Sequence, residues 1–185
     1  MTDLRPTADT SALLVIDIQE RLLPAIDPAA ADRVVQNARL LVEAAHLFGV
    51  PVIASEQYPR GLGPTIAPIA NALGGAAPLP KVEFSAVRNP ELAAAIAATG
   101  RRHIVVCGIE THVCVLQTAL DLVADGKVVH VASDAVGSRD PANRLVGLEI
   151  MRQAGAVVSS AETVAFQWAG RAGSEAFKAL SRLVR

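Results

Sequence analysis

A chain of 185 residues is long enough for one domain with a full hydrophobic core and too short for two domains of ordinary size. Its formal net charge is −1, and no basic block provides the positive surface that nucleic-acid binding requires. No stretch resembles a signal peptide or a membrane span, and two cysteines do not form a disulfide framework. We therefore expect a soluble, cytoplasmic, single-domain protein (residues 1–185) that acts on a small molecule, without nucleic-acid or membrane partners.

Short apolar runs and helical patterns alternate along the chain. Runs of strand length occur at residues 12–16, 50–54, 104–107, 128–132 and 156–159, and an alternating piece at 81–85 is typical of a short edge strand. Apolar spacing and capping residues predict helices at 32–48, 89–99, 111–125, 140–153, 162–168 and 174–183, with a shorter helix after Thr65. This alternation predicts an α/β fold in which helices cover both faces of a parallel sheet.

Polar residues follow several predicted strands at their carboxyl ends, the edge where open α/β sheets bind ligands. Asp17 ends the first apolar run, although an aspartate there could simply begin a turn. Segment 55–65 contains several Pro and Gly residues, which predicts a long loop that would either wall a pocket or connect two elements in solvent. Residues 133–139 form a second such loop. Lys81 by itself would face solvent, as most lysines do.

The segment 104–115 joins a buried strand to the first turn of a helix. Gly108 marks the end of the strand, and Thr111 opens an apolar pattern with helical spacing. Cys114 therefore lies in the first helical turn, where unpaired N–H groups and the helix dipole favour a thiolate and could hold an oxyanion. This position indicates a nucleophile; a small buried core residue is the alternative.

Three motifs resemble those of the isochorismatase-like cysteine hydrolases. They are Leu13-Leu14-Val15-Ile16-Asp17-Ile18-Gln19, Lys81-Val82-Glu83-Phe84-Ser85 and Gly108-Ile109-Glu110-Thr111-His112-Val113-Cys114-Val115-Leu116-Gln117-Thr118-Ala119, in the order and spacing of that family. The resemblance covers nearly the whole chain, and segments 55–59 and 110–112 are most similar to the isochorismatase domain-containing branch, whose substrates are poorly defined. The implied fold is a three-layer α/β/α arrangement around a Rossmann-like, six-stranded, mostly parallel sheet.

The resemblance also implies a reaction and a set of residues for it. The triad would be Asp17, Lys81 and Cys114, and a cis peptide between Ile109 and Glu110 would direct the N–H groups of Glu110 and Cys114 at one oxyanion. Lys81 and the helix N-terminus would lower the pKa of the thiol, and Asp17 would take its proton and pass it to a leaving amine. The expected activity is hydrolysis of an amide-type C–N bond of a small molecule through a Cys114 thioester.

Two features depart from well-known members of the family. Nicotinamidases hold a metal through an Asp-x-His pair, where this chain has Glu56-Gln57-Tyr58 with no histidine nearby. We therefore predict neither a metal nor a cofactor. True isochorismatases lack the nucleophilic cysteine, so Cys114 argues against their vinyl ether reaction. Family resemblance further implies a homo-oligomer.

Pocket-lining residues are expected to be Gln19, Gln57, Tyr58, Leu62, Phe84, Ile109 and Glu110, with Trp168 as a further candidate.

A Cys–His pair using His112 or His130 is the chemical alternative to the triad, although His112 should point away from Cys114 and the pattern around His130 is typical of a core residue. Cys107 should be inert in the core. The non-enzyme alternative is a silent family member that acts as a binding or scaffold protein.

Overall fold

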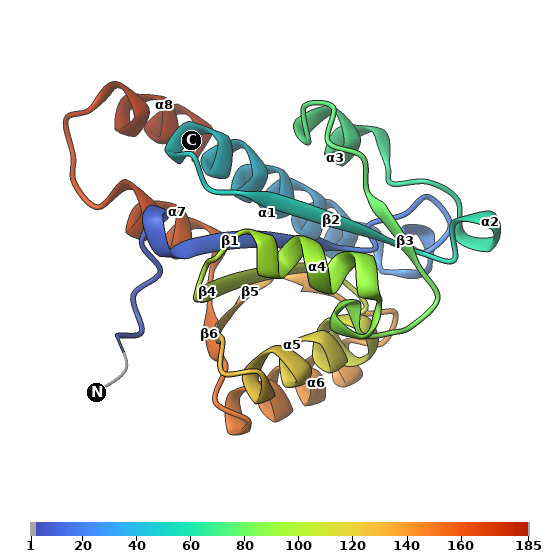
Figure 1. Ribbon diagram of the computed structural model, residues 1–185. Helices are drawn as coiled ribbons and strands as arrows, with labels where there is room; N and C mark the ends of the chain where they lie inside the picture. Colours follow the sequence, from blue (N-terminus) through green and yellow to red (C-terminus); the bar gives the residue numbers. More distant parts are fainter. Residues whose placement is uncertain (1–2, 185) are drawn as a thin grey trace.

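A six-stranded parallel sheet organises the computed structural model, which describes residues 3–184 (Figure 1). The strand order is β3-β2-β1-β4-β5-β6, and every neighbouring pair is parallel. The strands are β1 (Ser11–Ile16), β2 (Val52–Gln57), β3 (Leu79–Lys81), β4 (His103–Ile109), β5 (Val128–Gly137) and β6 (Val157–Ser159). The predicted three-layer α/β class is confirmed.

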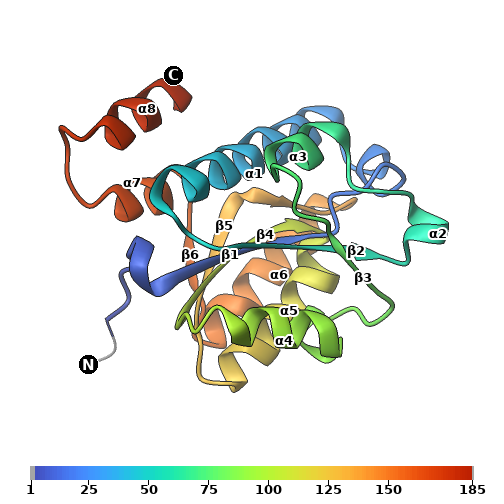
Figure 2. The ribbon, with the colours of Figure 1, turned by 45° about the horizontal axis from the view of Figure 1, so that its top comes forward.

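Helices cover both faces of the sheet (Figures 1 and 2). One face carries α1 (Pro28–Phe48), α3 (Ala67–Ala72), α7 (Ala161–Ala169) and α8 (Glu175–Leu183), and the other carries α4 (Pro90–Ala98), α5 (Leu116–Ala124) and α6 (Pro141–Gln153). The short α2 (Pro59–Leu62) lies beyond the carboxyl ends of the strands. Shorter turns are Ala8–Thr10, Leu23–Ala25, Ala86–Arg88 and the π-helical turn Thr111–Val115 that leads into α5. Within residues 3–184, no helix combines the length and apolar character needed to cross a membrane.

Capping residues place the helix ends where the sequence predicts them. Asn89 accepts hydrogen bonds from the first N–H groups of α4, and Asp140 does the same for α6. Gly49 ends α1 in the left-handed conformation, with φ of 69°. Helix α1 begins four residues before its predicted start because Asp27 caps it and Pro28 occupies its first turn.

Strand ends are where the sequence-based prediction is wrong. Segment 55–57, expected as loop, continues β2 because it pairs with residues 79–81 of β3. The predicted loop at 133–139 lies largely in β5, whose end pairs with β4. Polar composition pointed to loops, but pairing with a distant strand satisfies the backbone groups there. Strand β3 correspondingly ends at Lys81, where its predicted range began.

Gly108 lies inside β4 and does not end it. Its φ is +125°, and a Cβ at this position would overlap the carbonyl oxygen of Ile16 in the neighbouring strand β1. A residue without a side chain is needed there because the two backbones approach so closely. The ends of β1 and β4 are thereby held against one another, immediately before the segments that carry Asp17 and Cys114.

Candidate active site

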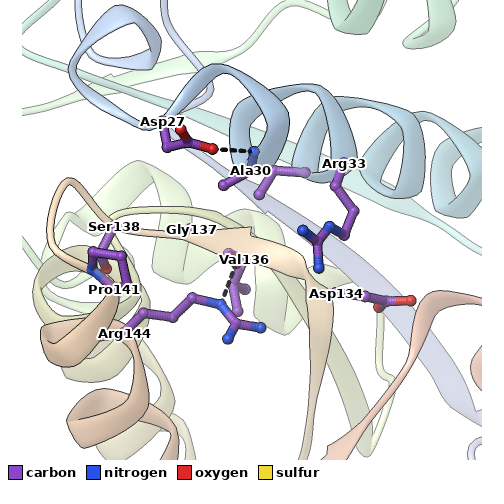
Figure 3. A pocket seen from close by; sticks show the side chains of 10 residues that line it. Asp27, Ala30, Arg33, Asp134, Val136, Gly137, Ser138, Pro141 and Arg144 are labelled. Carbon is purple, nitrogen blue, oxygen red and sulfur yellow. Dashed lines mark hydrogen bonds between the residues drawn. The ribbon is translucent and has the colours of Figure 1, made fainter.

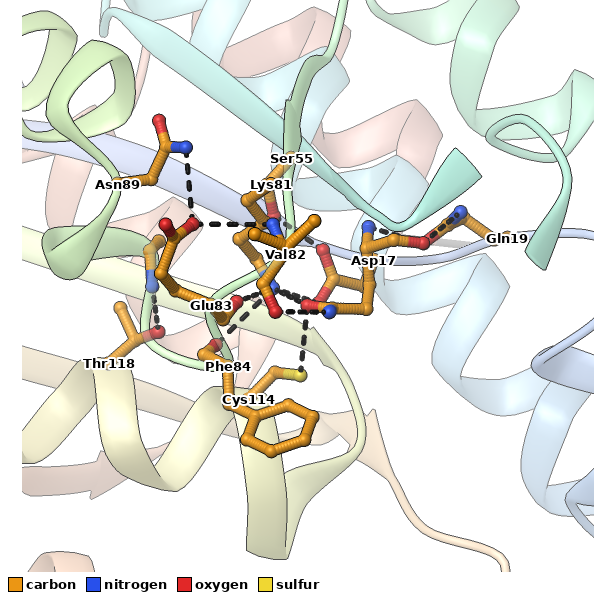
Figure 4. A network of polar contacts seen from close by, with 12 residues as sticks. Asp17, Gln19, Ser55, Lys81, Val82, Glu83, Phe84, Asn89, Cys114 and Thr118 are labelled. Atoms are coloured by element: carbon orange, nitrogen blue, oxygen red, sulfur yellow. Dashed lines mark hydrogen bonds and ion pairs between the residues drawn. The ribbon is translucent and has the colours of Figure 1, made fainter. Parts of the chain in front are cut away.

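Asp17, Lys81 and Cys114 meet at the carboxyl edge of the sheet (Figure 4). Asp17 directly follows β1, Lys81 ends β3, and Cys114 lies in the π-helical turn that precedes α5. Their exposed fractions are 0%, 2% and 5%, so all three polar side chains are buried. Three elements that are far apart in the chain thus bring a carboxylate, an ammonium and a thiol into one buried cluster.

The ammonium of Lys81 lies at the centre of this cluster. Its Nζ is 2.7 Å from Asp17 Oδ2 and 2.6 Å from Gln57 Oε1. It also donates to the carbonyls of Glu83 and Phe84, at 3.2 and 3.3 Å. The prediction that Lys81 by itself would face solvent is therefore wrong, because the bend after β3 wraps carbonyl oxygens around the amine and compensates its burial.

The carboxylate of Asp17 is held from two sides. Lys81 contacts Oδ2, and the hydroxyl of Ser55 donates to Oδ1 at 2.7 Å. Its backbone has φ of 53°, an uncommon conformation for a residue other than glycine. The chain thus turns sharply where β1 ends, and the side chain stays inside the protein next to β2.

Gln57 is more central than a pocket-lining residue. Its Oε1 accepts from Lys81 and lies 4.0 Å from Cys114 Sγ, while its Nε2 donates to the carbonyl of Val82 at 2.9 Å. Gln19 is fully buried and holds the Gln57 backbone, accepting from its N–H at 2.7 Å and donating to its carbonyl at 3.0 Å. The alternation of Ser55 and Gln57 along a strand could have indicated this role, had β2 been predicted to extend so far.

The environment of Cys114 favours a thiol in the resting protein. Burial, followed by the negative charge of Asp17, raises the pKa of Cys114 to about 12, although Lys81 opposes both. The expectation of a lowered pKa is therefore wrong. Lys81 does lower the pKa of Cys114, but its ion-pair partner Asp17 raises it, and burial outweighs the contribution of the lysine.

Alkylation at different pH values tests this resting state. The rate of Cys114 modification by iodoacetamide should rise about tenfold per pH unit from pH 7 to pH 9.5 without levelling, because only the thiolate reacts. Mass spectrometry of the Cys107→Ala variant, in which Cys114 is the sole thiol, would measure it. A plateau below pH 8 would show that the thiolate is already the resting form.

The other residues that were expected to line the pocket differ from one another in exposure and in contacts. Tyr58 and Phe84 are about half exposed (54% and 53%), and Leu62 is partly buried. Glu110 is also partly buried, and its Oε1 accepts from the backbone N and the Nε of Arg139, both at 3.0 Å. The peptide bond between Ile109 and Glu110 is cis.

Two of the candidate pocket residues belong to the core instead. Ile109 and Trp168 pack in the hydrophobic cluster on the α1 face of the sheet, whereas Cys114 belongs to the cluster on the opposite face. Strand alternation explains the position of Ile109, because successive side chains of β4 point to opposite faces. These two residues therefore lie apart from the cluster around Lys81.

The histidines engage partners other than Cys114. His112 Nδ1 lies 3.0 Å from the hydroxyl of Ser138. His130 is buried and stacks on His103 near the amino end of the sheet, and burial, then the neighbouring His103, lower the pKa of His130 to about 4. Across residues 3–184, no group of three or more His, Cys, Asp or Glu side chains is arranged to hold a metal ion.

The sheet and the polar cluster at its carboxyl edge place the chain among three-layer α/β proteins that bind ligands at their strand ends. The family model for the isochorismatase domain matches residues 11–163, and the chain belongs to this family. It is 37% identical over 177 residues to isochorismatase domain-containing protein 1 of Danio rerio, covering 95% of this chain and 61% of the relative. The chain thus spans about three fifths of that relative's length.

Solved structures share this fold. The MAR1 ribonuclease from Caenorhabditis elegans superimposes with a TM-score of 0.90 at 34% identity, covering 97% of this chain and 92% of that one. YcaC from Pseudomonas aeruginosa, with hexane-2,5-diol and covalent acrylamide, gives 0.88 at 25% identity over 100% and 97%. The Escherichia coli YcaC gene product, an octameric hydrolase of unknown specificity, gives 0.85 at 27% identity over 92% and 85%.

Proposed function

We propose that the protein is a cysteine hydrolase that cleaves an amide-type C–N bond of a small molecule through a thioester on Cys114. The observation that carries this proposal is the buried contact chain from Asp17 to Lys81, from Lys81 to Gln57 and from Gln57 to the sulfur of Cys114. Burying charged groups costs free energy unless they are paired, and perturbed ionisable groups gather at functional sites. Family membership in a group of hydrolases supports the same reading.

The resting thiol fits a mechanism in which deprotonation accompanies attack. As Sγ of Cys114 bonds to the substrate carbonyl carbon, Asp17 accepts the thiol proton, and the negative charge passes from Asp17 to the carbonyl oxygen. Lys81 remains at the centre of the cluster and compensates that charge throughout. The backbone N–H groups of Glu110 and Cys114 are the proposed donors to the oxyanion; one such donor typically contributes about 100- to 1000-fold in rate.

Collapse of the tetrahedral adduct breaks the C–N bond, and Asp17 returns its proton to the leaving amine. Water then attacks the thioester, Asp17 accepts a proton from it, and the carboxylic acid product leaves with the Cys114 thiol restored. Covalent acrylamide in the P. aeruginosa YcaC structure supports the presence of a reactive nucleophile in this fold, because acrylamide adds to soft nucleophiles such as thiolates. We expect Cys114 to be the corresponding atom here.

The second candidate function is a catalytically silent binding or scaffold protein. The raised pKa of Cys114 and its burial favour this alternative, since both disfavour the nucleophilic thiolate. Either function is compatible with a homo-oligomer, which we propose from the octameric E. coli relative and from exposed apolar residues on α6. Those residues are Leu145, Val146 and Ile150.

Acid quenching during turnover separates the two functions. The protein would be mixed with a panel of small amides and ureido compounds, quenched in acid within seconds and examined by mass spectrometry. We expect at least one compound to leave an acyl mass on the peptide that contains Cys114, together with release of its amine. Amine release without an acyl adduct would contradict the thioester, and neither signal across the panel would favour the silent protein.

A further inference from the structure

A pocket of about 280 Å³ lies at the carboxyl end of β5 between the N-terminal parts of α1 and α6 (Figure 3). The polar residues that line it include Arg33, Asp134, Ser138 and Arg144, and its lining does not include the cluster around Cys114. The pocket forms here because the sheet is narrower at this end: β6 pairs with β5 at residues 130–132, and residues 133–137 extend beyond it. The pocket is therefore formed by the part of β5 that extends beyond β6, separately from the cluster around Cys114.

Two guanidinium groups point into the same space from opposite helices (Figure 3). Arg144, on α6, is partly buried and donates to the carbonyls of Ser133 and Val136, which β6 does not reach. Arg33, on α1, is exposed and has no hydrogen bond or ion pair among residues 3–184. Burial lowers the pKa of Arg144 and the positive charge of Arg33 lowers it further, as expected for two like charges in proximity, while the negative charge of Asp134 opposes both.

The acidic residues of the pocket are engaged elsewhere. Asp27 accepts from the N–H of Ala30 as the cap of α1, and Asp134 accepts from the N–H of Ala161 at the start of α7. Asp134 also points away from both arginines in Figure 3. Within the described chain neither arginine forms an ion pair with a carboxylate, and the charge of Asp134 offsets only part of the effect of burial and of Arg33 on Arg144.

We propose that this pocket binds a small oxyanion, a carboxylate or phosphate group, between Arg33 and Arg144. A guanidinium offers paired N–H donors that match two oxygens of such a group, and Arg144 keeps one terminal nitrogen unused for this purpose. The N-terminal ends of α1 and α6 flank the pocket, but each already carries an aspartate cap, so the two arginines are the groups that supply positive charge. A bound oxyanion would relieve the repulsion between the two arginines.

Calorimetric titration of the full chain tests this proposal with inorganic phosphate and with acetate, each against sodium chloride at equal ionic strength. We expect saturable binding of at least one oxyanion, and at least tenfold weaker binding in Arg33→Gln. The matched control is Arg39→Gln, on the same helix but outside the pocket, which should bind as the wild type does. Tighter binding of phosphate would identify a phosphate group as the ligand chemistry, and tighter binding of acetate a carboxylate.

Further arms keep the test independent of folding and of the catalytic proposal. Arg144→Gln removes bonds to the edge of β5, so Arg33→Gln, an exposed position, carries the result. Cys114→Ala should retain oxyanion binding, because Cys114 is not part of the pocket lining. Heat signals equal to those of chloride, or equal losses in Arg33→Gln and Arg39→Gln, would overturn the proposal.

Discussion

Replacing Cys114 with alanine is expected to lower the rate of amide hydrolysis by roughly 10⁴- to 10⁶-fold, the range seen when a covalent nucleophile is removed. The sulfur is the atom that would bond to the substrate carbonyl, and nothing else in the contact chain from Asp17 to Gln57 offers a comparable nucleophile. Amine release from the best compound of the panel measures the loss. The wild type and the variant should unfold at similar denaturant concentrations, since the change removes one sulfur atom from a nearly buried position.

The matched control is Cys107→Ala, which removes the other buried cysteine. Cys107 is fully buried in β4, and burial raises its pKa to about 12, as it does for Cys114. Burial and pKa are therefore shared by the two thiols, and contact with Gln57 and Asp17 distinguishes them. Equal losses of activity in both variants would indicate damage to the fold and would refute a specific role for Cys114.

Replacing Lys81 with alanine should lower the free energy of unfolding by about 3–5 kcal/mol, the cost of leaving one partner of a buried ion pair alone. Asp17 is fully buried, and Ser55 would remain as the donor to its carboxylate. Guanidinium chloride unfolding at pH 7 measures the change. The Asp17→Asn/Lys81→Met double variant should recover most of the loss, because it removes both charges and largely preserves side-chain volume.

An exposed lysine provides the control for this effect. Lys178 lies 2.7 Å from Glu175 on α8, the same separation as in the buried pair, but both side chains are more than half exposed. Lys178→Ala should therefore change the unfolding free energy very little, because water compensates the remaining carboxylate. A loss in Lys81→Ala as small as in Lys178→Ala would show that the buried pair is not energetically coupled as the structure indicates.

Signals from residues that are close together in the chain are sufficient to predict the fold class. Apolar runs placed the central strands, and caps such as Asn89 and Asp140 placed helix starts, because both depend on residues close together in the chain. The ends of β2 and β5 could not be predicted in this way, because each is extended by pairing with a strand that is distant in the sequence. The predicted start of α1 at residue 32 is four residues too late, although the sequence contains the capping signal Asp27-Pro28.

The candidate site likewise has features that the sequence can predict and features that depend on contacts between distant parts of the chain. Asp17, Lys81 and Cys114 are individually ambiguous, and the family motifs are what grouped them before the structure placed them together. The direction of the Cys114 pKa shift depends on burial and on how closely Lys81 pairs with Asp17, which are properties of the folded chain. Nothing in the sequence joined Arg33 to Arg144, since each lies on a different helix.

The position of β3 at the sheet's outer edge has a consequence for the site. This strand has three residues, and Lys81 is its last, so the amine is carried by the part of the sheet that should fray first. Its bond to Asp17 reaches past β2 to the end of β1, and so acts as a brace across three strands. If β3 separated from β2, Asp17 would lose its counter-charge and the side chains around it would lose their fixed positions. The proposed activity should therefore depend on how tightly β3 stays paired at the edge of the sheet.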